Sequence, residues 1–194
     1  MKIGFDLDGV LADLYDLWLA VIAYEYGIKN IIGQSECNQY SIKKVINERC
    51  GVNLSRNNMD SALDFIIPQI NIVKPFKGAK KILKTVSMSA KNPVIITARL
   101  DKYKDCTRAW VDQWLGDYEV FHAASDQKVG VALRLGLNAF VEDKASTAMS
   151  MAAAGIKSYL IDRPWNQNIG QREGVVRVNE LKDIVGHCWA SITN

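Results

Sequence analysis

The chain has 194 residues, of which 48% are hydrophobic and 23% are charged, with 24 Lys and Arg against 21 Asp and Glu. This composition is typical of a globular domain and excludes disordered, collagen-like and fibrous proteins. The basic residues are spread along the chain, so we expect no nucleic acid polymer as a partner. No run approaches the roughly 18 apolar residues of a membrane helix, and the N-terminus lacks the apolar centre of a signal peptide. We therefore expect a cytoplasmic protein without membrane contact; a homodimer is one assembly state that the sequence leaves open.

The spacing of the cysteines and histidines is not typical of a zinc site or of a disulfide framework. The cysteines have no CxxC spacing, and the two histidines, His122 and His187, lie far apart. Neither a zinc site nor a disulfide framework is indicated. We interpret the cysteines as reduced structural thiols. They are Cys37, Cys50, Cys106 and Cys188.

Five segments have the length and composition of strands. The first is "KIGFD", and the others are "PVIITAR" (93–99), "YEVFHA" (118–123), "NAFVED" (138–143) and "KSYLID" (157–162). Helical stretches at 103–116, 126–136 and 145–155 separate the later strands, and Gly136 and Gly155 are placed to end two of these helices. Alternating strands and helices predict βαβ units. The fold class is therefore α/β, a doubly wound, Rossmann-like parallel sheet of five strands covered on both faces.

Residues 14–74 have a different pattern. Leu14, Leu17, Trp18, Val21 and Ile22 follow a helical period, and the stretches "YSIKKVINERC" and "DSALDFIIPQI" are also helical, with no convincing strand. We expect a small helical unit inserted into the sheet domain. The predicted core comprises residues 1–13 and 75–194.

Polar residues stand at the carboxyl ends of the predicted strands. Asp6 ends the first strand, with Asp8 just beyond it, and Thr97 ends the second. Glu142 and Asp143 end the fourth strand, and Lys128 lies in the helix before it. Each residue alone is explained by a turn, a helix cap or a solvated surface. Together they predict one site, because ligands of open parallel sheets bind outside the carboxyl ends of the strands.

A cluster of carboxylates requires a cation. Oxygen ligands without His or Cys favour Mg²⁺ over zinc, and Mg²⁺ binds one or two carboxylates together with substrate phosphate and water. The predicted substrate is therefore a phosphate ester. A carboxylate beside the metal can attack phosphorus to form an aspartyl-phosphate, while Thr97 and Lys128 neutralise the phosphoryl oxygens.

The motifs "DLDGV", "ITAR", Lys128 and "VEDK" resemble, in order, the four motifs of the haloacid dehalogenase superfamily. The resemblance implies a sheet order of 3-2-1-4-5 and an inserted cap. It implies that Asp6 is the nucleophile and a metal ligand, and that Asp8 is the general acid/base and binds the metal through its backbone carbonyl. Thr97, Ala98 and Lys128 would bind the phosphoryl group. Asp143 would complete the metal site. Glu142 would lie outside the direct ligands and act on the metal through water.

Dehalogenases of the superfamily generally lack the second aspartate, so Asp8 favours a phosphatase. The longer motif "FDLDGVLAD", the modest cap and "LIDRPWNQ" are similar to the 5'(3')-deoxyribonucleotidase family. This similarity implies a small phosphorylated metabolite as partner, a nucleoside monophosphate. Candidate substrate contacts are Tyr15, Trp18, Tyr40 and Arg99.

Three alternatives stay open. A sugar-phosphate phosphatase or a phosphomutase would use the same chemistry, and a relic of the fold that binds phosphorylated ligands would use none. The tail "DRPWN" also has a purely structural interpretation, in which Pro164 ends a strand and Trp165 packs in the interior.

Overall fold

A parallel sheet with the strand order β3-β2-β1-β4-β5-β6 forms the centre of the structure. The computed structural model describes residues 1–89 and 92–190, and within them the sheet has six strands. Phe5 of β1 pairs with Ile95 on one side and Val141 on the other, so β1 is central. The strands are β1 Ile3–Phe5, β2 Val94–Thr97, β3 Val120–His122, β4 Ala139–Glu142, β5 Lys157–Ile161 and β6 Val175–Val178.

The expectation of five strands is wrong, because β6 adds a sixth beside β5. The order of the other five is as predicted. The chain passes from β5 to β6 without an α-helix, through the short 3-10 helix η4 (Pro164–Asn166). The alternation of strands and helices therefore gave no signal for β6. Its only charged residue, Arg177, is accommodated because its guanidinium pairs with Asp162.

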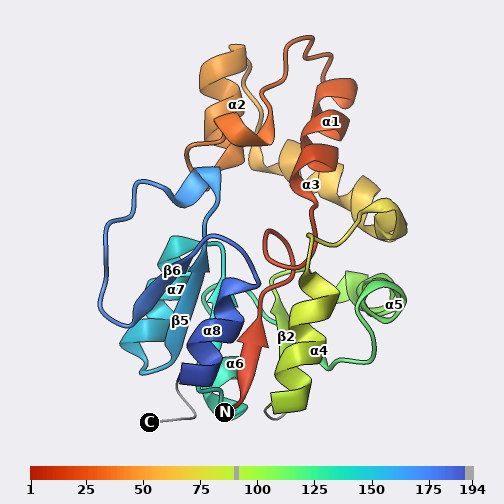
Figure 1. Cartoon of the computed structure of the whole chain (residues 1–194). Coiled ribbons are helices and arrows are strands. Elements are labelled where there is room, and N and C mark those ends of the chain that lie inside the picture. Colours follow the sequence, from red (N-terminus) through yellow and green to blue (C-terminus); the bar gives the residue numbers. More distant parts are fainter. Residues whose placement is uncertain (90–91, 191–194) are drawn as a thin grey trace.

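Helices cover both faces of the sheet. Alternate strand residues point to opposite faces. Ile95 and Val141 pack with α4, α5 and α8, whereas Ile96 and Phe140 pack with α6 and α7. Figure 1 shows α4 and α8 side by side in front of the sheet. These helices are α4 Ala79–Ser89, α5 Lys104–Trp114, α6 Lys128–Arg134, α7 Ala145–Ala153 and α8 Asp183–Ala190.

The three predicted helices of the sheet domain are confirmed as α5, α6 and α7. Gly136 and Gly155 follow α6 and α7 with φ angles of +64° and +78°. These left-handed conformations are costly for other residues, and they end a helix. Both glycines therefore act as the predicted helix terminators.

Residues 14–74 contain helices and no strand, as predicted. They form α1, α2 and α3, which lie beyond the carboxyl ends of the strands (Figure 1). Apolar side chains of these three helices, such as Ile22, Val45 and Ala62, form their own buried cluster. The last part of the segment packs differently, because Ile67 and Ile70 join the core of the sheet. The elements are α1 Tyr15–Glu25, η1 Gln34–Glu36, α2 Ile42–Cys50, α3 Arg56–Ile66 and η2 Ile67–Ile72.

Cys37, Cys50 and Cys106 are free thiols, as expected. The side chains of Cys188 and His187 lie outside the part that the structure describes. Among the described residues, no helix combines the length and apolar character needed to cross a membrane.

Candidate active site

The sheet brings the predicted residues to one edge. Asp6 follows β1 directly, and its N–H donates to the carbonyl of Val141 at 2.9 Å. Thr97 and Glu142 are the last residues of β2 and β4, which flank β1. Lys128 is the first residue of α6. Because the strands are parallel, these side chains lie at the edge that faces α1 and α3 (Figure 1).

Lys128 joins two buried carboxylates. Its Nζ lies 2.8 Å from Oδ1 of Asp6 and 3.1 Å from Oε2 of Glu142. Burial, together with the charge of Glu142, raises the pKa of Asp6 well above its ordinary value. Burial also raises the pKa of Glu142, although Lys128 opposes that shift. Burial disfavours the Lys128 ammonium, but Asp6 and Glu142 outweigh this effect and raise its pKa.

Asp143 adds a third buried carboxylate. Its Oδ2 accepts a hydrogen bond from the indole Nε1 of Trp165 at 3.0 Å. Its Oδ1 is buried without a hydrogen-bond partner among the described residues. Burial and the charge of Asp6 raise the pKa of Asp143 to about 7. Gly9 makes room for this carboxylate, because a Cβ at Gly9 would lie 2.3 Å from Oδ2.

These three carboxylates fit a divalent cation. One oxygen from each of Asp6, Glu142 and Asp143 can be chosen so that all lie within 4.8 Å of one another. The Lys128 ammonium contacts two of these carboxylates, those of Asp6 and Glu142, and not that of Asp143. The Oδ1 of Asp143, which has no hydrogen-bond partner among the described residues, and the all-oxygen donor set suit a hard cation such as Mg²⁺. Glu142 thus stands closer to the centre of the cluster than the sequence predicted.

Asp8 is held outside this cluster by Arg99. Nε of Arg99 lies 2.9 Å from Oδ2 of Asp8, and Nη2 lies 2.7 Å from Oδ1. Nη1 of Arg99 also donates to the hydroxyl of Thr107 at 3.3 Å. The hydroxyl of Thr97 accepts a hydrogen bond from the backbone N–H of Arg99 at 3.2 Å. The loop after β2 therefore fixes the orientation of the Asp8 carboxylate.

A cavity of about 470 Å³ opens above these residues. Asp6, Asp8 and Lys128 border it, whereas Thr97, Glu142 and Asp143 are buried and do not. The candidate substrate contacts border the same cavity, as does Ala98. They are Tyr15, Trp18, Tyr40 and Arg99.

One wall of the cavity carries charges that the sequence did not reveal. Arg56, Asp60 and Asp64 lie on α3, four residues apart, so they occupy one face of that helix. Lys102, in the short 3-10 helix η3 (Asp101–Tyr103), lies with its Nζ 2.6 Å from Oδ1 of Asp64. This ion pair joins α3 to the loop after β2. The spacing of Arg56, Asp60 and Asp64 in the sequence could have predicted that they share one face of a helix. It could not have predicted that this face borders the cavity, because that depends on how the chain folds.

The "DRPWN" segment contacts the site as well. Trp165 is buried, and besides its hydrogen bond to Asp143 its ring stacks on Tyr15, with centroids 4.1 Å apart. Nε of Arg163 donates to the carbonyl of Gly9 at 2.8 Å. The purely structural interpretation of this segment is therefore incomplete, because Trp165 touches a carboxylate of the cluster.

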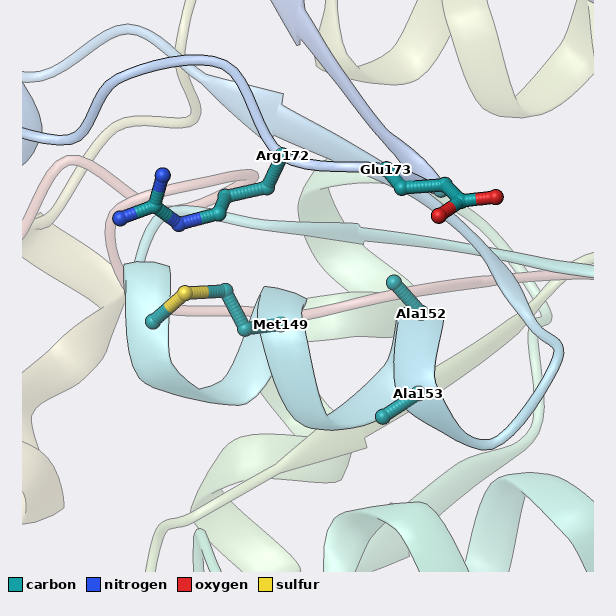
Figure 2. A pocket seen from close by; sticks show the side chains of 6 residues that line it. Met149, Ala152, Ala153, Arg172 and Glu173 are labelled. Atoms are coloured by element: carbon teal, nitrogen blue, oxygen red, sulfur yellow. The ribbon is translucent and has the colours of Figure 1, made fainter.

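A separate cavity of about 420 Å³ lies between α7 and the segment before β6. Figure 2 shows Met149, Ala152 and Ala153 on the helix, with Arg172 and Glu173 extending in opposite directions above it. Among the residues that line it are no members of the carboxylate cluster. This second cavity is therefore separate from the carboxylate cluster.

The fold is shared with solved structures of hydrolases. A haloacid dehalogenase family hydrolase from Deinococcus radiodurans, solved with bound phosphate and sodium, is similar with a TM-score of 0.65 and 16% identity, over 98% of this chain and 95% of that one. A predicted phosphoglycolate phosphatase from Haemophilus somnus is similar with a TM-score of 0.64 and 16% identity, over 96% of this chain and 97% of that one. The fold is that of the haloacid dehalogenase-like hydrolases.

Comparison of the sequence with known proteins shows the family to which the chain belongs. The model of the family described as "5' nucleotidase, deoxy (Pyrimidine), cytosolic type C protein" matches residues 1–188. A nucleotidase from Clostridium acetobutylicum is 27% identical over 175 residues, which cover 87% of this chain and 86% of the relative. The chain belongs to this 5'-nucleotidase family, a family of phosphatases. The resemblance stated from the sequence motifs is confirmed.

Proposed function

We propose that this phosphatase is a Mg²⁺-dependent nucleotidase that hydrolyses a nucleoside monophosphate through an aspartyl-phosphate intermediate. The observation that carries the proposal is the buried cluster of Asp6, Glu142 and Asp143 around Lys128, placed below a cavity bordered by aromatic rings. We infer a cytoplasmic enzyme, in line with the cytosolic type named in the family's description.

Asp6 is the nucleophile. It is the member of the carboxylate cluster that borders the cavity, so its carboxylate can reach the phosphorus of a bound ester. Asp6, Asp143 and Glu142 would hold the metal, joined by the backbone carbonyl of Asp8. Bound Mg²⁺ would neutralise the carboxylates and allow the phosphate dianion to approach them. Asp6 attacks phosphorus, the ester oxygen leaves, and water then releases phosphate from Asp6.

Lys128 and the loop after β2 bind the phosphoryl group. The Lys128 ammonium borders the cavity beside Asp6, so it can neutralise phosphoryl oxygens as negative charge moves onto them. Ala98 borders the cavity just after the neighbouring strand, so its backbone N–H would suit the same oxygens, and the Thr97 hydroxyl lies one residue before it at the end of that strand. Preorganised donors of this kind lower the barrier without reorganisation during the reaction.

Asp8 is the general acid and base. It protonates the leaving oxygen of the nucleoside in the first step and takes a proton from water in the second. The proposal is supported by its position at the cavity wall and by the two contacts with Arg99 that orient its carboxylate. Arg99 therefore acts on the substrate mainly through Asp8, although it also borders the cavity.

The aromatic rings of the cavity favour a nucleotide. We infer that residues 14–74 form a cap that presents Tyr15, Trp18 and Tyr40 to the base of the substrate. Stacking of a base on an aromatic side chain contributes about 1 to 3 kcal/mol, which corresponds to roughly 5- to 150-fold in preference. A sugar phosphate lacks an aromatic base and would not gain this stacking energy.

The charged wall of the cavity favours the alternative, a sugar-phosphate phosphatase or phosphomutase of the same superfamily. Arg56, Asp60, Asp64 and Lys102 offer hydrogen-bond partners to the hydroxyl groups of a sugar. The measurement that separates the two is kcat/KM for a panel of 5'- and 3'-(deoxy)nucleoside monophosphates against hexose and triose phosphates. We expect nucleotides to be preferred, with deoxypyrimidine forms first. A tenfold preference for a sugar phosphate would keep the phosphatase chemistry and overturn the nucleotidase proposal.

A tyrosine pair provides a matched control for the stacking role. Tyr40 borders the cavity, whereas Tyr24 is 88% exposed on α1 and does not. Tyr40→Leu should lower kcat/KM for nucleotides by about fivefold or more, and Tyr24→Leu should leave it unchanged. Equal effects of the two substitutions would contradict base stacking on Tyr40.

A further inference from the structure

We propose that Trp165 is a positioning residue that holds the Asp143 carboxylate in the orientation required for Mg²⁺ binding. The indole Nε1 of Trp165 donates to Oδ2 of Asp143 at 3.0 Å, and both side chains are buried. Trp165 does not border the substrate cavity. It therefore acts through Asp143 and not on the substrate. The inference rests on the proposed function, because it concerns the metal that this function requires.

The hydrogen bond distinguishes the two oxygens of Asp143. Oδ2 is occupied by the indole N–H, and Oδ1 is left without a hydrogen-bond partner among the described residues. A carboxylate that can rotate presents either oxygen, whereas an N–H on one side keeps the other oxygen available as a ligand. Side chains that orient metal ligands in this way typically change metal affinity or activity by about 10- to 100-fold when they are replaced.

Trp165 is itself held from two sides. Its ring stacks on Tyr15 of α1, with centroids 4.1 Å apart and an interplanar angle of 25°. The next residue, Asn166, donates from Nδ2 to the backbone carbonyls of Asp143 and Ile161, both at 2.8 Å. The loop after β5 therefore fixes both the backbone and the carboxylate of Asp143. A packed indole loses little further entropy when it forms the hydrogen bond.

The test replaces the N–H while keeping an aromatic ring. Trp165→Phe retains a ring that can stack on Tyr15 and removes the donor. Trp114→Phe is the matched control, because the Nε1 of Trp114 is buried without a hydrogen-bond partner among the described residues, and Trp114 does not border the cavity. Binding of Mg²⁺ alone to each protein is measured by isothermal titration calorimetry, and turnover of a deoxynucleoside monophosphate is measured as a function of Mg²⁺ concentration.

We expect Trp165→Phe to weaken Mg²⁺ binding by about tenfold or more and to raise the Mg²⁺ concentration for half-maximal turnover in parallel. Saturating Mg²⁺ should restore kcat, and KM for the nucleotide should stay near that of the wild type. Trp114→Phe should match the wild type throughout. A general structural defect would instead lower kcat at every Mg²⁺ concentration. Unchanged Mg²⁺ affinity in Trp165→Phe would overturn the inference.

A measurement on the wild type covers the case in which Trp165→Phe does not fold. The chain has five tryptophans, and their indole N–H signals can be assigned and followed by NMR during a Mg²⁺ titration. The signal of Trp165 should shift with Mg²⁺, while that of Trp114 should not. Mg²⁺ binding without a shift at Trp165 would overturn the inference and leave the proposed function intact. A wild type that neither binds Mg²⁺ nor hydrolyses nucleotides would overturn both.

Discussion

The guanidinium of Arg99 contacts both carboxylate oxygens of Asp8, with Nε 2.9 Å from Oδ2 and Nη2 2.7 Å from Oδ1. The side chain of Arg99 is 3% exposed, while that of Asp8 is 25% exposed. A planar guanidinium with two donors imposes a direction on a carboxylate that a single ammonium does not. The aspartate proposed to transfer protons is therefore oriented by a buried partner on the neighbouring strand end.

Arg99→Met should lower kcat by up to about 100-fold, because a misdirected acid/base group loses the geometry of proton transfer. KM should change less than kcat. Arg99→Lys should lie between the wild type and Arg99→Met, since it keeps the charge without the two-donor contact. Arg108→Met is the control, because Arg108 pairs with Asp112 on α5 and does not border the cavity. Equal kcat values for Arg99→Met and the wild type would exclude an orienting role.

The metal-free protein should be less stable at pH 8 than at pH 5. Burial raises the pKa of Asp6 well above its ordinary value and that of Asp143 to about 7, whereas both are near 3.9 in an unfolded chain. Between about pH 3.9 and pH 7, the folded state therefore binds more protons than the unfolded state. The resulting stability is fully present below about pH 4 and is lost as the pH rises through about 7.

The free energy of unfolding by urea, measured in EDTA at pH 5 and pH 8, checks this prediction. Mg²⁺ should reduce the difference, because a bound cation stabilises the ionised carboxylates. Asp143→Asn should also reduce it, since the amide does not titrate. A metal-free protein that is more stable at pH 8 than at pH 5 would show that these carboxyl groups do not dominate the pH dependence.

The sheet was largely predictable from the sequence, except for its last strand. Continuous apolar runs ending in polar residues identified β1, β2 and β4, because strands buried on both faces leave little room for polar side chains. The segment that forms β6 contains Arg177 and follows β5 without an intervening α-helix. The loop after β5 supplies partners for that guanidinium, namely Asp162, Asn166 and the carbonyl of Ile169. These partners of Arg177 come together only when the chain has folded, so the sequence alone did not indicate this strand.

The site was predictable where residues follow strands directly, and less so elsewhere. Asp6, Thr97 and Asp143 lie at one edge of the sheet because parallel strands end there, a rule that needs only strand assignment. The contact between Trp165 and Asp143 joins residues 22 positions apart through a loop whose conformation no periodicity describes. The central place of Glu142 likewise depends on the direction of one buried side chain toward Lys128.

Removal of metal should silence the enzyme. EDTA should abolish turnover, and Mg²⁺ should restore it. Ca²⁺ should inhibit, because it accepts more oxygen ligands at about 2.3 to 2.6 Å, against about 2.0 to 2.1 Å for Mg²⁺. The larger ion would allow Asp6 to bind through both oxygens, and a carboxylate engaged in this way would be a poor nucleophile. Full activity in EDTA-treated protein would exclude metal assistance, and equal activity with Ca²⁺ would exclude this explanation of metal choice.

The most direct test of the account is the turnover of Asp6→Asn at saturating Mg²⁺ and nucleoside monophosphate. The amide cannot attack phosphorus, so kcat should fall by about four orders of magnitude or more. The variant should still fold, because Lys128 keeps its contact with Glu142 and one buried carboxylate is removed. Asp16→Asn, an exposed position on α1, should retain the wild-type rate. A folded Asp6→Asn protein with near wild-type turnover would contradict the covalent mechanism.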